Sequence, residues 1–150
     1  MKTTTWFALG LAALLATTGA SAAPPAKDII ASKDAPAAVG PYSQAVRSGS
    51  MVFLAGQLPI DPKTGQTRTG SIEEQTAQVL DNLKAVLAAD GMTMDNIVST
   101  TVYVKELNDF SKLNTVYGTY FREKPPARAT VQVQRLPKDV AVEISAIAVR

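Results

Sequence analysis

The residues best suited to chemistry lie near the C-terminus, where two strand-like segments carry Arg128 and Glu143. Arg128 follows the proline pair of 125-PPARATVQV-133. Its planar, permanently charged guanidinium suits bidentate binding of a carboxylate rather than proton transfer. Glu143 could orient a water molecule or move a proton if partial burial raised its pKa. The alternative, which periodicity alone favours, is an ion pair at an interface that only fixes the register.

The chain contains no His and no Cys. Their absence excludes Ser-His-Asp triads, Cys-His pairs and metal sites built from thiolate and imidazole ligands. It also means that no disulfide can stabilise the protein. Any catalysis must therefore rely on carboxylates, Tyr, Lys, Arg, hydroxyls and backbone groups.

The N-terminus has the three parts of a secretory signal peptide. Lys2 supplies a positive charge, an apolar run extends from Trp6 to Ala16, and Ala20-Ser21-Ala22 forms an A-x-A cleavage signal. The apolar run is shorter than the roughly 20 residues that a membrane-spanning helix needs. We therefore predict a signal peptide over residues 1–22, cut after Ala22 or Ala23. The mature chain is expected to be periplasmic or secreted, with no membrane anchor.

The charge of the mature chain argues against a nucleic-acid partner. The sequence has 15 Lys and Arg against 13 Asp and Glu, and the signal segment carries only Lys2, so removing it leaves a net charge of +1. Nucleic-acid binding needs clustered positive charge, and no basic cluster is visible. The remaining length predicts a leader over residues 23–34 and one domain over residues 35–150.

The pattern of the domain predicts the order β-β-α-β-α-β-β, an α+β fold. Two strand-like runs within 42–57 flank a turn at Ser48-Gly49-Ser50. Ser71 and Glu74 form a capping box for a helix over about 72–89, which Gly91 ends. The other expected elements are a strand over 97–107, a helix that Asn108 or Asp109 caps and Pro125 stops, and strands over about 128–134 and 140–148.

The last two strands are expected to form a hairpin centred between Leu136 and Pro137, which pairs Arg128 with Ser145 and Thr130 with Glu143. One face of this hairpin would lie under the helices and carry Ala129, Val131, Val133, Val140, Val142, Ile144 and Ala146. The other face would carry Arg128, Thr130, Gln132, Glu143 and Ser145.

The segment 52-VFLAG-56 places apolar residues on both faces of its strand. Two helices of the expected length cover only one face of such a sheet. A second copy of the chain is the simplest cover for the other face. The alternative is a monomer with a partly apolar open face.

Four strings of the sequence resemble the Rid/YjgF family, and specifically its RidA branch of imine deaminases. They are 35-APAAVGPYSQAV-46, 55-AGQLPIDPKTG-65, 105-KELNDFSKLN-114 and 126-PARATVQVQRLPKDVAVEISAIAVR-150. The similarity extends from about Lys33 to Arg150. The last string, with P-x-R, R-L-P and E-I-x-A-I-A at these spacings, is the most specific.

The resemblance implies a chorismate-mutase-like subunit that closes into a homotrimer with clefts between subunits. It also implies hydrolysis of 2-imino acids, such as 2-iminobutanoate and 2-iminopropanoate, to 2-keto acids and ammonia. No metal or organic cofactor is needed for that reaction. The family's carboxylate-binding arginine and water-positioning glutamate fall on Arg128 and Glu143. Further substrate-binding positions fall on Tyr42, Gly56, Asn114 and Thr130.

Two features separate this chain from the family pattern. Thr130 stands where the family often has Cys, which leaves the backbone N–H unchanged but excludes thiol modification. The export signal is unusual because 2-imino acids arise mainly from cytosolic enzymes. Two alternatives therefore stay open: a trimeric protein that binds small carboxylates without turnover, and a holdase that presents apolar surface to unfolded exported proteins.

Overall fold

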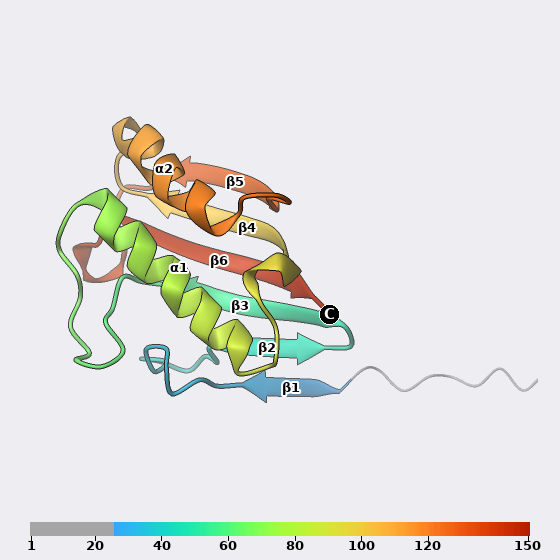
Figure 1. The fold of residues 1–150 in the computed structure, drawn as a ribbon. Coiled ribbons are helices and arrows are strands. Elements are labelled where there is room, and N and C mark those ends of the chain that lie inside the picture. The colour runs from blue at the N-terminus through green and yellow to red at the C-terminus, as the bar shows by residue number, and fades with distance from the viewer. Residues whose placement is uncertain (1–25) are drawn as a thin grey trace, which may run out of the picture.

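The computed structural model describes residues 26–150. They form one six-stranded mixed sheet, in the order β1-β2-β3-β6-β4-β5, with both helices on one face (Figure 1). The strands are β1 (Lys27–Ile30), β2 (Ala45–Ser48), β3 (Met51–Gln57), β4 (Ile97–Val104), β5 (Ala127–Gln132) and β6 (Val142–Val149), and the helices are α1 (Ile72–Ala88) and α2 (Phe110–Tyr120). Short 3-10 turns lie at Met94–Asn96, Leu107–Asp109 and Pro137–Asp139. The predicted signal peptide lies outside the described residues.

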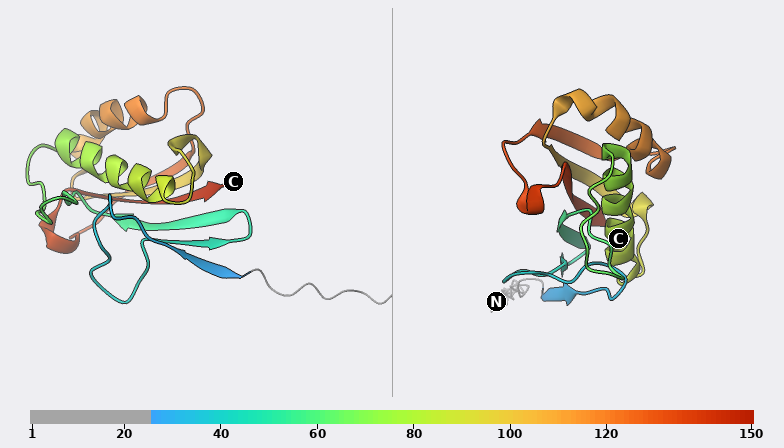
Figure 2. Two further views of the ribbon diagram at one scale, coloured as in Figure 1. Left: turned by 60° about the horizontal axis from the view of Figure 1, so that its bottom comes forward. Right: turned by 90° about the vertical axis from the view of Figure 1, so that its left-hand side faces the viewer.

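The expected α+β architecture is confirmed, with two helices packed against one face of the sheet (Figure 2). The structure adds one strand that the sequence pattern did not reveal. β1 lies within the predicted leader and pairs antiparallel with β2, with Ile30 opposite Ala45. The N-terminal segment of the domain is therefore part of the sheet.

Helix α1 begins at the predicted capping box. The Glu74 N–H donates to the Ser71 hydroxyl at 3.3 Å, and the Ser71 N–H donates to the Glu74 carboxylate at 3.0 Å. Gly91 follows the helix with a φ of 67°, a conformation that glycine adopts without steric cost. The inner face of α1 packs into a core that also takes side chains from β3, β4, β6 and α2. Burial of this apolar stripe is what stabilises the helix against the sheet.

The predicted hairpin of the last two strands is wrong. β5 pairs in parallel with β4, with Arg128 beside Thr100, and forms one edge of the sheet. β6 lies between β3 and β4 and is antiparallel to both. Parallel neighbours need a crossover connection, and helix α2 supplies it between β4 and β5. The chain then passes β4 before it enters the sheet again.

This topology also corrects the faces predicted for β5. Arg128 and Thr130 face the helix layer, because their pairing partners Thr100 and Val102 are buried there. Val131, expected under the helices, is 44% exposed. On β6 the prediction holds, since Val142, Ile144 and Ala146 are buried against the helices.

The face of the sheet opposite the helices is partly apolar. Its exposed side chains include Ile29, Met51, Phe53 and Val131. The apolar character expected on both sides of β3 is therefore present, because Val52 and Leu54 are buried on the other side. Among residues 26–150 no helix combines the length and the apolarity needed to cross a bilayer.

Candidate functional site

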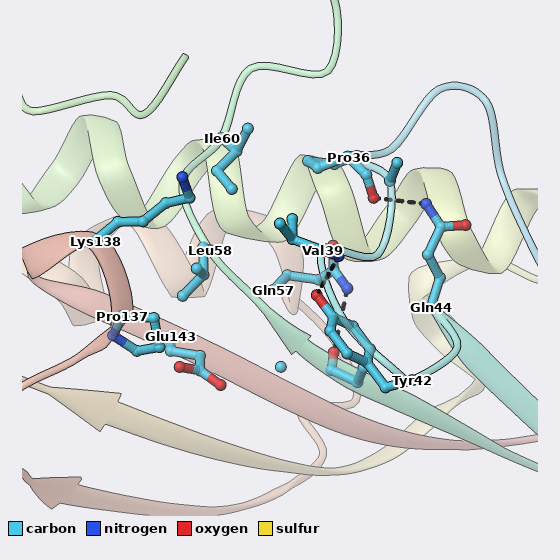
Figure 3. A pocket seen from close by; sticks show the side chains of 13 residues that line it. Pro36, Val39, Tyr42, Gln44, Gln57, Leu58, Ile60, Pro137, Lys138 and Glu143 are labelled. Carbon is cyan, nitrogen blue, oxygen red and sulfur yellow. Dashed lines mark hydrogen bonds between the residues drawn. The ribbon is translucent and has the colours of Figure 1, made fainter. Parts of the chain in front are cut away.

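A cleft of about 540 Å³ brings together three of the predicted site residues, Tyr42, Gly56 and Glu143 (Figure 3). The Glu143 side chain enters it from β6, and the Tyr42 ring from the segment before β2. Most of the remaining lining is apolar and comes from Pro36, Ala37, Val39, Ala55, Leu58, Ile60 and Pro137, with Gln44, Gln57 and Lys138 as polar members.

Glu143 is half-buried and sits directly against Gly56. The register between β3 and β6 shifts between Leu54 and Gln57, an irregularity that turns Gly56 toward Glu143. A Cβ placed on Gly56 would lie 2.8 Å from the carboxyl carbon of Glu143 and 3.1 Å from its Cγ. Burial raises the pKa of Glu143 above its ordinary value, because the charged carboxylate loses solvation. The carboxyl group is thus suited to exchanging a proton with a water molecule.

If the Glu143 carboxyl group takes part in catalysis, replacing Gly56 with Ala is expected to lower kcat/KM about tenfold or more, because its displacement would lose the near-attack geometry. The added methyl would meet the Glu143 carboxylate, whose end is the part able to move. Gly118→Ala on α2 is the matched control, since no atom lies within 4 Å of the Cβ it adds. Equal activity of both variants and the wild type would show that the Glu143 position against Gly56 has no catalytic role.

Two buried amides hold the walls of the cleft. Gln44 donates from Nε2 to the carbonyl of Pro36 at 2.7 Å, which fixes the N-terminal wall. Asn82, on the inner face of α1, donates from Nδ2 to the carbonyls of Leu58 and Ile60 at 3.0 and 2.9 Å. Both side chains are themselves buried, so losing these hydrogen bonds would leave unpaired polar groups at a cost in stability.

Tyr42 is 51% exposed and closes a tight turn. Its N–H donates to the carbonyl of Gly40 at 2.8 Å, and its hydroxyl oxygen accepts from the Val39 N–H at 3.3 Å. The phenolic hydrogen is not used in either contact, so it is available to a ligand in the cleft.

Lys138 is a lining residue that the sequence did not indicate. Lys138 and Asp139 both adopt positive φ, at 59° and 57°, which is uncommon outside glycine. A bidentate ion pair between Arg135 and Asp139, with distances of 2.6 and 2.9 Å, bridges this turn. The turn brings Lys138 to the wall formed by Leu58 and Ile60 (Figure 3).

Arg128 lies apart from this cleft, on the helix side of β5. Its guanidinium carbon is 4.6 Å from the centre of the Tyr117 ring and 5.4 Å from that of the Phe110 ring. The ion pairs found within residues 26–150 use other cations, namely Arg47, Arg68, Lys112, Arg135 and Arg150. Arg128 therefore keeps its N–H groups free for an external anion.

Thr130 and Asn114 lie on the same side of the sheet as Arg128, which is the side of the helices. Thr130 lines a surface depression with Arg128, Phe110 and Leu107, and its buried Oγ1 has no hydrogen-bond partner. Asn114 is half-buried on α2, the helix that carries the two rings beside Arg128. The contact of Arg128 with the aromatic side chains of α2 was not predicted from the sequence.

The predicted site residues thus form two groups on opposite faces of the sheet. Tyr42, Gly56 and Glu143 gather at the cleft, while Arg128 and Thr130 face the helix layer. The predicted shared polar face of β5 and β6 is wrong, because β4 separates the two strands. One subunit alone does not bring Arg128 to Glu143. In the part of the chain that the structure describes, no three His, Cys, Asp or Glu residues are grouped to hold a metal ion.

The chain is similar to known proteins over most of its length. The family model described as endoribonuclease L-PSP matches residues 32–150. A RutC family protein of Pyrococcus horikoshii is 53% identical over 122 residues, covering 81% of this chain and 97% of that protein. A Salmonella typhimurium protein named 2-iminobutanoate/2-iminopropanoate deaminase is 52% identical over 124 residues, covering 81% and 96%. The solved structure of the YjgF gene product of Escherichia coli matches with a TM-score of 0.79 and 49% identity, covering 82% of this chain and 98% of that one.

Proposed function

The chain belongs to the endoribonuclease L-PSP family, and we propose that it hydrolyses small 2-imino acids, such as 2-iminobutanoate and 2-iminopropanoate, to 2-keto acids and ammonia. The observation that carries the proposal is Arg128, whose guanidinium lies over two aromatic rings with no carboxylate partner among the described residues. Such a cation is ready to bind the carboxylate that every 2-imino acid carries. The similarity to the Salmonella typhimurium deaminase supports the same substrate class.

The chemistry needs few catalytic groups, because an iminium carbon is already electrophilic. In the proposed reaction Arg128 holds the carboxylate, and Glu143 accepts a proton from a water molecule as its oxygen bonds to the imine carbon. Glu143 then returns that proton to the nitrogen of the tetrahedral adduct. The C–N bond breaks and ammonia leaves, while the hydroxyl on the same carbon gives its proton to Glu143 and becomes the C=O group. The Tyr42 hydroxyl and the backbone N–H groups of Gly56 and Thr130 complete the substrate contacts.

We propose that the site is completed in a homotrimer. Arg128 and Glu143 lie on opposite faces of one sheet, so a substrate that touches both must lie between subunits. The exposed apolar side chains on the open face, among them Phe53 and Val131, supply a surface for such assembly. The Asn114 side chain would border the substrate on the Arg128 side.

The proposal includes export of the mature chain. The support is the order of Lys2, the apolar run and the A-x-A sequence at the N-terminus. N-terminal sequencing of the protein made by a Gram-negative host tests this directly. A mature N-terminus at Ala23 or Pro24 in the periplasmic fraction is expected, and an intact Met1 in the cytosol would contradict export.

Turnover is tested with 2-iminobutanoate generated in place by an amino-acid oxidase, while 2-keto acid and ammonia release are followed against the spontaneous rate. Acceleration by the wild type and none by Arg128→Ala is expected. Saturable binding of 2-oxobutanoate without acceleration of hydrolysis would contradict the deaminase and favour a carboxylate-binding protein. Suppression of aggregation of an unfolded client, unaffected by Arg128→Ala, would instead favour a holdase.

A further inference from the structure

The guanidinium of Arg128 is placed by aromatic rings, in contrast to arginines of this chain that form ion pairs. Arg47 and Arg135 form ion pairs with aspartates at N–O distances of 2.6 to 2.9 Å. Arg128 instead has Tyr117 at 4.6 Å and Phe110 at 5.4 Å from its guanidinium carbon. A ring face attracts a cation but leaves its N–H groups unused, whereas a carboxylate would occupy them.

The Tyr117 ring is itself fixed against the sheet. Its hydroxyl forms a 2.8 Å hydrogen bond with the Thr100 hydroxyl, and both groups are buried. Thr100 is the direct pairing partner of Arg128 across the β4–β5 ladder, so the ring is tied to the strand position beside the cation. Burial raises the pKa of Tyr117, which keeps the phenol neutral and prevents it from becoming a competing anion.

Phe110 is exposed although it is large and apolar. It is the first residue of α2, is 38% exposed, and lines the surface depression that contains Arg128 and Thr130. Its seven-residue spacing from Tyr117 puts both rings on one side of the helix. Packing alone does not explain an aromatic ring at such an exposed position, whereas its contact with the Arg128 guanidinium does.

We infer that Phe110 and Tyr117 form an aromatic platform that positions the Arg128 guanidinium for carboxylate binding. The inference rests on the proposed role of Arg128. It adds two residues that affect substrate binding indirectly, by positioning Arg128. The platform holds the planar guanidinium in one orientation and leaves its N–H donors free. Binding of the substrate therefore costs less side-chain entropy, because Arg128 is already ordered. These residues are positioning residues, and their loss should weaken binding rather than slow the chemical step.

The test uses substrate turnover together with the dissociation constant for 2-oxobutanoate, an unreactive carboxylate. Phe110→Leu and Tyr117→Leu are each expected to raise KM and this dissociation constant by about threefold to tenfold, with kcat within about twofold of the wild type. Tyr117→Phe and Phe110→Tyr keep a ring and should restore tight binding. Tyr120→Leu is the control, because Tyr120 lies on the same helix but bonds to Asp81 on α1.

The outcomes separate the platform from the proposed function. Loss of affinity in Arg128→Ala with unchanged affinity in Phe110→Leu and Tyr117→Leu would overturn the platform and leave the deaminase intact. Unchanged affinity in Arg128→Ala would overturn both. A fall in kcat at constant KM in the leucine variants would also overturn the platform. Because Phe110 is exposed, its variant keeps the test valid if Tyr117→Leu proves unstable.

Discussion

Replacing Arg128 with Lys is expected to lower kcat/KM for 2-iminobutanoate by about 100-fold, although the charge is retained. Lysine offers a compact ammonium in place of a planar fork, so it cannot bind a carboxylate bidentately. It also cannot lie flat over the Tyr117 and Phe110 rings, which are 4.6 and 5.4 Å from the guanidinium carbon. The measurement is the rate of 2-keto acid release at substrate concentrations well below KM.

The matched control for this variant is Arg122→Lys, because Arg122 is exposed beyond the end of α2. Its activity should equal that of the wild type. Size-exclusion chromatography should give the same oligomer for all three proteins, since Arg128 is bound by ring faces rather than by a buried ion pair. Near-wild-type activity of Arg128→Lys would mean that a point charge is sufficient and that the bidentate contact is absent.

Replacing Glu143 with Gln is expected to lower kcat by about 100-fold or more, the usual loss when a positioned acid or base is removed. Gln keeps the size of the side chain against Gly56, so the cleft should retain its shape. Glutamine can still hydrogen-bond a water molecule but cannot take its proton. Glu123→Gln, at an exposed position after α2, is the control.

The pH profile identifies the role of Glu143 more sharply than the rate alone. Burial raises its pKa above the ordinary 4.5, so the carboxylate becomes protonated at a higher pH than an exposed glutamate. If the carboxylate is the proton acceptor, kcat must fall as the pH drops through this raised value. Glu143→Gln should lack that acid limb once the spontaneous hydrolysis is subtracted. An identical acid limb in the variant would remove Glu143 from proton transfer.

Local patterns predicted most of the secondary structure because their signals lie within a few residues. The capping box of Ser71 and Glu74 gave the start of α1. The pairing partner of β5 was not predictable in this way. The side chains of 127–132 alternate in the same way whether β5 pairs with β6 in a hairpin or with β4 in parallel. Apolar alternation alone then assigned Val131 to the core, and its exposure shows that an edge strand does not obey that rule.

The candidate site was predicted in its residues but not in its arrangement. The sequence segments that resemble the Rid/YjgF family indicated Arg128 and Glu143 as site residues. The structure places these two residues on opposite faces of the sheet. The platform under Arg128 was missed because ring contacts across α2 and β5 depend on tertiary packing. Lys138 was missed because a positive φ outside glycine carries no clear sequence signal.

The central claim is that Arg128 and Glu143 of neighbouring subunits form one site. Its most direct test is the activity of mixed oligomers made by refolding Arg128→Ala and Glu143→Gln subunits together. Each variant alone should have about one per cent of the wild-type activity or less. If every site takes Arg128 from one subunit and Glu143 from its neighbour, random mixing in equal amounts should restore about a quarter of the wild-type activity, because one pairing in four contains both residues. No restored activity in oligomers proven to be mixed by two affinity tags would contradict a site shared between subunits.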